Sequence, residues 1–254
     1  ITLNFINIPK VIETNTNFLL ENVSASATGF AYSSSLPDTF VDYSSRLSKS
    51  MLKDNKRMMR RLSEMGELKF SVIDAPQEFD HVLETMMAQK IEIYELSNSR
   101  NIFLDKSTKA FYTNIGILYR RGLSIHLSTL SLDQEILATH LGLHYGGRFY
   151  YLMPTFNHDK KWRKFSLGRI HLEKLVDWAI ENQMNTFDFT IGAEAYKNIW
   201  CDSEMPLYRH FKVRSLRGIG YYLYDILINV VKKNPRLKTL AVKLLSLQHK
   251  IFTR

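Results

Sequence analysis

Apolar positions recur every three to four residues in four parts of the chain, which is the spacing of amphipathic helices. A sparse stripe of this kind, with Met51 and Leu62 in it, runs through residues 38–66 and predicts one long basic helix that ends at Gly66. Denser stripes predict three more helices, over residues 74–94, 107–122 and 167–183. Each of these helices has one apolar face that must pack against a core.

The parts between the helices alternate between apolar and polar positions, which is typical of strands. Gly146 and Gly147 stand between two of the longest alternating runs and indicate a hairpin. The runs lie at residues 69–74, 123–132, 135–145, 148–156, 186–191 and 206–215. This order predicts a mixed α/β (α+β) fold with a largely antiparallel sheet flanked by helices. It is not the order of a doubly wound nucleotide fold, and the sequence has neither a GxGxxG nor a GxxxxGK[ST] phosphate loop.

The composition is that of a globular chain rather than a disordered one. Of the 254 residues, 45% are hydrophobic and 23% are charged. The single cysteine, Cys201, excludes an intrachain disulfide and fits a reducing compartment, so we expect a cytoplasmic location. The sequence shows no signal-peptide pattern and no apolar run near the ~20 residues of a membrane span. Because the first residue is Ile1 rather than Met, we expect a part of the protein upstream of it.

The net charge of +9 is concentrated in two places. One basic cluster runs from Arg46 to Arg61, and after Asp225 the chain has basic residues and no acidic one. Such clusters attract nucleic acid, anionic lipid or phosphorylated cofactors, although a solvated helix face is an equal explanation for the first. Residues 218–254 predict two basic amphipathic helices. They either pack on a missing part of the protein or bind an anionic membrane surface, through residues 232–254.

A family resemblance is carried by two segments, LSKSMLKDNKRMMRRLSEMG and GRFYYLMPTFNHDKKWRKFSLGRIHLEKLVDWAIENQMNTFDFTIGAEAYKNIW. In order and spacing, over about residues 44–212, the chain resembles the CelD/BioF2-like acetyltransferases, which have the GNAT fold and are relatives of the FemAB peptidyl transferases. The Gly-Asp-Glu-x-Tyr-Lys pattern of that family appears here as GAEAYK, with Ala193 in place of the aspartate. Members often carry two GNAT-like halves. The resemblance implies a GNAT-like domain at 43–217, a remnant of or link to a first half at 1–42, and additional C-terminal helices at 218–254.

The resemblance implies that the phosphates of coenzyme A bind at the turn KFSLGR, where a helix is predicted to begin. Amides at a helix start have no partners within the helix, and the helix dipole favours an anion there. The residues implied are Lys164, Ser166, Leu167, Gly168 and Arg169. An ordinary capped surface helix with basic flanks is the alternative.

The resemblance also implies that the acyl group of the donor lies along the strand YLMPTF, against Met153 and Thr155. In the GNAT fold the fourth and fifth strands part to admit the donor, and a backbone N–H faces the acyl oxygen. Pro154 lacks an N–H, which fits a place where a ladder opens. A simple strand end is the alternative.

Four side chains are candidates for the acid and the base of an acyl transfer. Tyr196 is the candidate acid, since a phenol with a pKa near ~10 is protonated at neutral pH, and its alternative role is packing in the core. Glu194, Asp188 and His158 are candidates for the base or for orienting the amine. Asp188 points away from its phenylalanine neighbours, and a structural salt bridge is its alternative role. The histidines show no metal-ligand spacing, so we expect no metal.

The main hypothesis is an N-acyltransferase that moves an acyl group, with acetyl-CoA or another acyl-CoA as donor, to an amine. An amino sugar or a polysaccharide or cell-envelope precursor is the kind of acceptor that the resemblance implies. A second hypothesis keeps the fold and takes the acyl group from aminoacyl-tRNA, with the basic segment 46–61 on RNA phosphates. A third is a scaffold without activity on a membrane surface, because Ala193 replaces the family aspartate. We expect nucleic acid as a partner only in the second case, and a location that is cytoplasmic, at most peripheral on the inner face of the membrane.

Overall fold

The computed structural model describes residues 2–12, 14–21 and 25–213, together with the separate positions 219, 220, 223, 227 and 234. The chain forms two compact units, which are described separately below. The larger is Phe30–Met205, and the smaller combines Ile1–Gly29 with Pro206–Arg254. The domain borders predicted at residues 42/43 and 217/218 stay a prediction. The helices predicted over 218–254 lie almost wholly outside the described residues.

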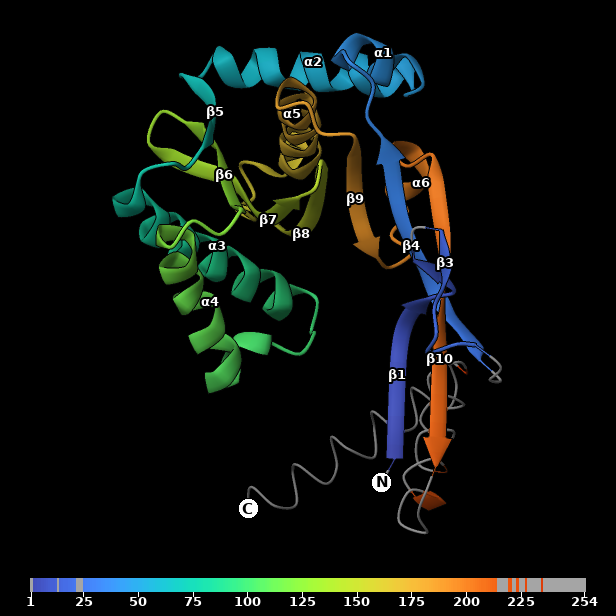
Figure 1. The fold of residues 1–254 in the computed structure, drawn as a ribbon. Coiled ribbons are helices and arrows are strands. Elements are labelled where there is room, and N and C mark those ends of the chain that lie inside the picture. The colour runs from blue at the N-terminus through green and yellow to red at the C-terminus, as the bar shows by residue number, and fades with distance from the viewer. Residues whose placement is uncertain are drawn as a thin grey trace. The chain divides into compact units, whose positions relative to one another are not determined.

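A sheet forms the centre of the larger unit, in the order β4-β9-β8-β7-β6-β5 (Figure 1). Strands β5 to β8 form the predicted antiparallel meander, β4 pairs with β9 antiparallel, and β8 pairs with β9 in parallel. The sheet is therefore mixed and largely antiparallel, as the sequence predicted. The strands are β4 (Ser26–Ser35), β5 (Leu68–Val72), β6 (Ile125–Leu132), β7 (Glu135–Tyr145), β8 (Arg148–Phe156) and β9 (Thr186–Ile191).

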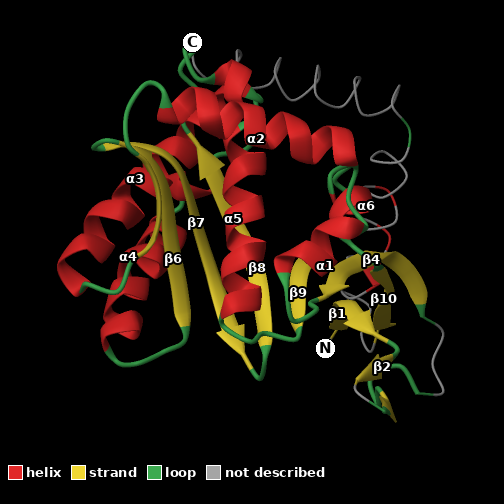
Figure 2. Ribbon diagram, turned by 90° about the horizontal axis from the view of Figure 1, so that it is seen from above, coloured by secondary structure: helices red, strands yellow, loops and turns green. Residues whose placement is uncertain are grey.

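Helices cover both faces of this sheet. Figure 2 shows α5 (Leu167–Glu181) on the near side of β7 and β8, with α3 (Pro76–Leu96) and α4 (Lys106–Arg120) on the far side. One apolar cluster joins α5 to α1 (Phe40–Ser45), α2 (Lys49–Ser63), β8 and β9, and another joins α3 and α4 to β6 and β7. The remaining short elements are the 3-10 helices Ile102–Leu104 and Arg163–Phe165 and the helix α6 (Lys197–Trp200).

The long basic helix predicted over residues 38–66 is wrong, because two helices occupy that segment. Helix α1 ends at Ser45, and Ser48 then caps α2 by accepting the backbone N–H of Met51 at 3.5 Å. Leu47, which the apolar pattern assigned to the stripe of one helix, lies buried between them. The Ser48 cap starts a new helix within the apolar stripe, so the segment forms two helices rather than one.

A bulge in β8 decides which side chains of that strand face which helices. Leu141 of β7 lies opposite Met153, whereas the next residue, Gly142, lies opposite Tyr151, so Leu152 is the extra residue. Tyr151 accordingly packs in the cluster beneath α5, and Met153 packs in the cluster beneath α3. The bulge lies just beyond the last paired residues of β8 and β9.

The smaller unit is a strand pair with a short hairpin. Strand β1 (Thr2–Pro9) pairs antiparallel with β10 (Ser203–Val213), and β2 (Val11–Ile12) pairs with β3 (Asn15–Thr16). The buried side chain of Asn17 donates a hydrogen bond of 2.9 Å to the carbonyl oxygen of Pro9. This bond fixes the hairpin to the end of β1.

Candidate active site

Strands β8 and β9 separate soon after they begin. In the described part of the chain they pair only where Arg148–Tyr150 lies beside Thr186–Asp188, and they continue apart to their ends (Figure 1). The bulge at Leu152 lies just beyond the last pair. A parallel pair that opens in this way leaves backbone groups of both strands available to a third group. The pairing thus ends just before the segment YLMPTF, along which the resemblance implied that the donor lies.

The end of β9 adopts left-handed backbone. Thr190 has a φ of 61° and Gly192 a φ of 115°; a β-branched residue seldom adopts the first, and the second favours glycine. A Cβ on Gly192 would lie 2.7 Å from both carboxylate oxygens of Glu194, so glycine also leaves room for that carboxylate. Strain of this kind concentrates at functional sites. Here it turns the chain from the strand into the segment that carries Glu194 and Tyr196.

Asp188 is held by an ion pair. Its Oδ2 lies 2.9 Å from a guanidinium nitrogen of Arg148, and its Oδ1 accepts a hydrogen bond of 2.8 Å from the backbone N–H of Thr190. Both oxygens therefore stabilise the short β8–β9 pair and the turn that follows it. This is the structural alternative that the sequence left open, and a role of Asp188 as base stays a prediction.

Tyr196 lies beside the place where the two strands separate. Its ring is 6.2 Å from that of Phe189 on β9, which is 5.8 Å from the ring of Tyr151 on β8. Burial raises the pKa of Tyr196, and the charge of Glu194 raises it further. The phenol therefore remains protonated at neutral pH and is able to donate a hydrogen bond or a proton.

Lys197 is a residue of this site that the sequence reasoning missed. Its side chain is only 2% exposed, and its Nζ lies 2.9 Å from Oε2 of Glu194. The same nitrogen donates to the carbonyl oxygens of Ile191 at 3.0 Å and Thr190 at 3.4 Å. A buried cation is stable only with partners of this kind. The one signal in the sequence was its place in the GAEAYK pattern, because local periodicity does not indicate burial of a lysine.

Glu194 is a carboxylate at neutral pH, and Cys201 is a thiol. Burial acts to raise the pKa of Glu194, but the hydrogen bond and the charge of Lys197 outweigh it, so the pKa lies below its ordinary value. The Glu194 side chain is 56% exposed and is accessible to an acceptor. Burial raises the pKa of Cys201 to about 12. Since the thiolate is the nucleophilic form, Cys201 is unsuited to carry the acyl group.

The start of α5 has the backbone shape of an anion site. Ser166 precedes the helix in the left-handed region, with φ 48° and ψ 48°, and directly follows a 3-10 turn. Among the described residues no side chain caps this end, so Ser166 does not act as the cap that its position allowed. A right-handed turn followed by a left-handed residue directs successive N–H groups to one side, where they bind anions. The amides of Leu167 and Gly168 lie at this end of the helix.

The basic side chains predicted at this turn are less suited than the amides to bind an anion. Arg169 donates to Asn55 and lies 2.9 Å from Asp54, both on α2, so its charge is already paired. Lys164 is exposed, with its Nζ 5.1 Å from the ring of Phe165. The side chain of Leu167 is buried in the core. The structure therefore offers amides, rather than the Arg169 guanidinium, to an anion at the start of α5.

Met153 and Thr155 present their side chains to the α3 side of the sheet. Met153 is in the apolar cluster there, and the hydroxyl of Thr155 donates a hydrogen bond of 2.6 Å to Oε1 of Gln89 on α3. The Gln89 amide nitrogen in turn donates to the carbonyl oxygen of Ile136 at 3.2 Å. Both predicted residues are thus within the strand that borders the opening, and only their backbone is suited to contact a donor there.

His158 lies apart from the other three candidates. It follows the end of β8, with its ring 4.3 Å from that of Phe156, and burial lowers its pKa. Glu194 and Tyr196 belong to the segment that follows β9, whereas His158 follows β8. Within the described residues, no group of three histidine, cysteine, aspartate or glutamate side chains is arranged to hold a metal.

A comparison with protein families gives this site a context. Residues 49–198 match the family model described as acetyltransferase (GNAT) domain. The match covers more than half of the chain, so the chain belongs to the GNAT acetyltransferase family, and its fold is GNAT-like. No curated protein matches the sequence.

Solved structures share this fold at low sequence identity. The C-terminal domain of a putative lysylphosphatidylglycerol synthetase from Agrobacterium fabrum is 14% identical, with a TM-score of 0.55 and coverage of 88% of this chain and 72% of that one. FemX is 13% identical, with a TM-score of 0.50 and coverage of 71% and 62%. A conserved protein of unknown function from Bacteroides thetaiotaomicron is 11% identical, with a TM-score of 0.52 and coverage of 75% and 62%. The chain therefore spans less than two thirds of the length of the last two proteins.

A search of the described helices for a long apolar stretch finds none that could cross a membrane.

Proposed function

We propose that this protein transfers an acyl group from an acyl-CoA thioester to an amine. The observation that carries the proposal is the separation of β8 from β9, with Tyr196 beside it. The donor would lie between the two strands, and its diphosphate would bind the amides at the start of α5. A backbone N–H of the bulged part of β8 would face the acyl oxygen, in which negative charge develops.

The reaction needs a neutral amine and a protonated leaving group. The amine nitrogen attacks the thioester carbonyl carbon and gives up a proton to a base, the carbon–sulfur bond breaks, and the sulfur receives a proton. Tyr196 is the proposed donor of that proton, because its raised pKa keeps it protonated. Glu194 is the proposed residue that orients the amine, and Lys197 holds Glu194 in position. Asp188 and His158 are further candidates for the base, Asp188 only if its ion pair with Arg148 opens.

The acceptor that we propose is a small molecule with an amine, such as an amino sugar or a cell-envelope precursor. Members of this family and the likeness to FemX support that choice. We place the reaction in the cytoplasm, and attachment to the inner face of the membrane through residues 232–254 is part of the same hypothesis. An acyl-CoA donor would be used as a substrate, and the proposed chemistry uses no metal.

An aminoacyl-tRNA ester is the second candidate donor. The fold shared with FemX and with a putative lysylphosphatidylglycerol synthetase domain supports it, and so do the exposed basic residues of α2. A donor of this kind would present an RNA backbone to the protein, and its binding would weaken steeply as the salt concentration rises. Binding of coenzyme A, with far fewer phosphates, would weaken much less.

Isothermal titration calorimetry with acetyl-CoA and, separately, with a charged tRNA tests the two donors. We expect heat with acetyl-CoA that coenzyme A abolishes by competition, and transfer of radiolabelled acetyl to an amino-sugar acceptor. Binding of the charged tRNA alone would favour the second donor. Absence of heat with both would overturn the enzymatic proposal and favour a scaffold.

A further inference from the structure

Helix α2 presents a continuous basic face. Met51, Asn55 and Leu62 point to the core, and the charged residues occupy the opposite, exposed side. Their spacing of three, four and seven residues places them along one face of a helix. They are Lys49, Lys53, Lys56, Arg57, Arg60 and Arg61. Nothing proposed above for acyl transfer from a thioester uses this face.

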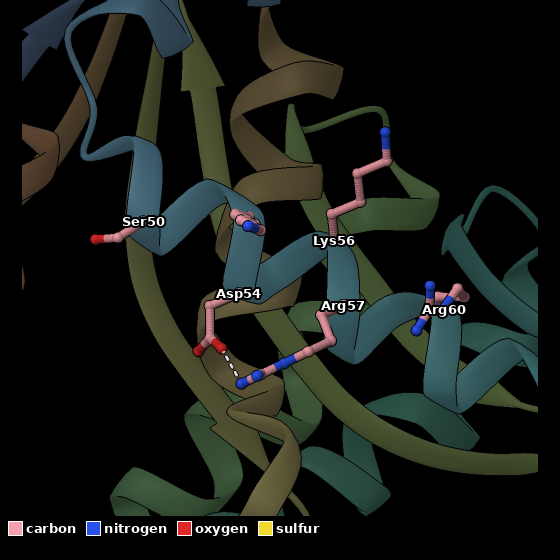
Figure 3. Close-up of a pocket in the computed structure, with 6 residues that line it drawn as sticks. Ser50, Asp54, Lys56, Arg57 and Arg60 are labelled. Atoms are coloured by element: carbon pink, nitrogen blue, oxygen red, sulfur yellow. Dashed lines mark hydrogen bonds and ion pairs between the residues drawn. The ribbon is translucent and has the colours of Figure 1, made fainter.

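A hollow of about 640 Å³ lies along this face (Figure 3). This volume is within the usual range of small-molecule sites, which is about 300–1,000 Å³. The described residues that line it are all on α2: Ser50, Lys53, Asp54, Lys56, Arg57 and Arg60. All six lining side chains end in a polar or charged group, and four of them are cations, which suits phosphate oxygens.

The single carboxylate of the hollow is already neutralised. Figure 3 shows Asp54 directed at the guanidinium of Arg57, and its other oxygen lies 2.9 Å from Arg169 of α5. Arg60 lies 3.4 Å from Glu64, but both side chains are largely exposed, and such a pair contributes little. The four cations and one carboxylate of the lining give it a net charge of +3. Lys53 and Lys56 are exposed, and the donors of Arg60 are able to change partner.

We propose that this hollow binds the diphosphate group of a small molecule. A single phosphate monoester carries about 1.5 to 2 negative charges at neutral pH, so a diphosphate matches a net charge of +3. The arginine forks would bind pairs of phosphate oxygens, and the lysines would act as point charges. Through Arg169, the hollow adjoins the start of α5. This diphosphate would belong to the acceptor, because the proposed function places the diphosphate of the donor at the α5 amides, and this assignment rests on that proposed function.

The test is calorimetric titration of inorganic pyrophosphate into protein saturated with coenzyme A. The variant Lys53→Glu with Lys56→Glu should bind pyrophosphate at least about tenfold more weakly than the wild type, because two charge-assisted contacts become repulsive. The control is Lys106→Glu with Lys109→Glu on α4, on the other side of the sheet. It makes the same change in charge at exposed positions and should leave affinity within about twofold. Circular dichroism confirms that both variants fold.

Competition distinguishes the sources of the diphosphate. Displacement of pyrophosphate by a uridine diphosphate amino sugar supports a nucleotide carrier, and displacement by an isoprenyl diphosphate in detergent supports a lipid carrier. Absence of pyrophosphate binding by the wild type, or equal weakening in the α4 control, overturns the inference. The inference is also overturned if anionic phospholipid vesicles or tRNA bind through Lys53 and Lys56 and pyrophosphate fails to displace them. Failure of the proposed function would appear instead as absent acyl transfer with pyrophosphate binding intact.

Discussion

Two adjacent residues at the start of α6, Tyr196 and Lys197, have different parts in the candidate site. Lys197 is buried and fixed by the carbonyl oxygens of Thr190 and Ile191, whereas Tyr196 is half-buried and borders the strand opening. A fixed cation positions Glu194 without side-chain freedom of its own, which lowers the entropy cost of holding that carboxylate in place. Tyr196 therefore has the position of a reacting group, and Lys197 has that of a positioning residue.

Replacing Tyr196 with phenylalanine should lower kcat by about 100-fold, at the lower end of the range for loss of an acid, because a thiolate is itself a good leaving group. The ring contact with Phe189 stays, so thermal unfolding should change little. Steady-state kinetics with acetyl-CoA, together with the melting temperature, measures both. Wild-type kcat in this variant would remove Tyr196 from the mechanism.

Replacing Gly192 with alanine should destabilise the protein by about 1–2 kcal/mol, because the left-handed φ of 115° disfavours a side chain. The new Cβ would also push the carboxylate of Glu194 away from Lys197. The pKa of Glu194 should then rise, which NMR titration of its side chain detects.

The matched control is Gly122→Ala. That glycine also has a positive φ, of 82°, and a Cβ there would meet no atom within 4 Å. It should show a comparable loss of stability without any effect on Glu194. A rise in the pKa of Glu194 in both variants would contradict the local explanation.

At this scale the sequence allowed only part of the site to be predicted. Tyr196 and Glu194 could be proposed because they follow a predicted strand in the GAEAYK pattern. The burial of Lys197 could not, since it depends on carbonyl oxygens that become available only where β9 leaves its regular conformation. The pairing of Arg169 with α2 was equally out of reach, because it joins residues that are 115 positions apart in the chain.

At the scale of elements, the start of α5 combines two features that stabilise a bound anion. The helix supplies amides and a favourable dipole, and the left-handed Ser166 directs those amides to one side. Since the Ser166 side chain does not cap the helix, its hydroxyl contributes little to the stability of this end. Its backbone conformation is therefore the property that substitution should test.

Replacing Ser166 with glycine should leave stability nearly unchanged, within a few tenths of a kcal/mol, because glycine tolerates φ 48° and no capping bond is lost. Replacing it with valine should cost about 1–2 kcal/mol, since a β-branched side chain disfavours that region. The KM for acetyl-CoA should stay constant in the first variant and rise in the second. A large rise with glycine would instead indicate that the hydroxyl itself binds the donor.

The elements show where periodicity succeeds and where it fails. The meander of β6, β7 and β8 and the helix α5 were predicted within a few residues, because each carries a long, regular apolar pattern. The break between α1 and α2 was missed, because one serine cap decided it against a continuing apolar stripe. Similarly, α4 begins at Lys106, one residue before the predicted helix of residues 107–122, because the carboxylate of Asp105 caps it by accepting the amides of Ser107 and Thr108. The spacing of apolar residues does not show which of several neighbouring Ser or Asp residues caps a helix.

At the scale of the larger unit, the space between the sheet and α5 contains three buried histidines. His126 and His140 lie on β6 and β7, and their ring nitrogens have no hydrogen-bond partner among the described residues. His171 of α5 lies 3.1 Å from the hydroxyl of Ser128. Burial lowers the pKa of His126 and of His171 to about 3, and it lowers that of His140 well below the ordinary value. The core is thus built around three neutral imidazoles.

These histidines should make the protein sensitive to acid. Between pH 6.5 and about 3 the unfolded chain binds protons at these sites that the folded protein does not, so stability rises with pH in that window. The contribution of the neutral histidines to the free energy of unfolding is complete above pH 6.5. It is lost as the pH falls, by up to about 1.4 kcal/mol per pH unit for each histidine. Urea unfolding at several pH values measures this slope. The variant His126→Leu removes one of these titrating groups, so the slope of stability against pH should decrease by the contribution of one histidine. Leucine fills much of the same apolar space beside Trp178, so the variant should still fold.

The control replaces a histidine outside the buried cluster, the exposed His81 of α3, with glutamine. An unchanged slope in His126→Leu would mean that His126 takes up a proton in the folded protein, which requires water or a counter-ion in the core. The same packing that buries these rings also carries Tyr151, which stacks on His140 at 4.5 Å and borders the strand opening. Because these rings take up protons above about pH 3 only when the chain unfolds, any loss of kcat through the cluster should coincide with the unfolding transition.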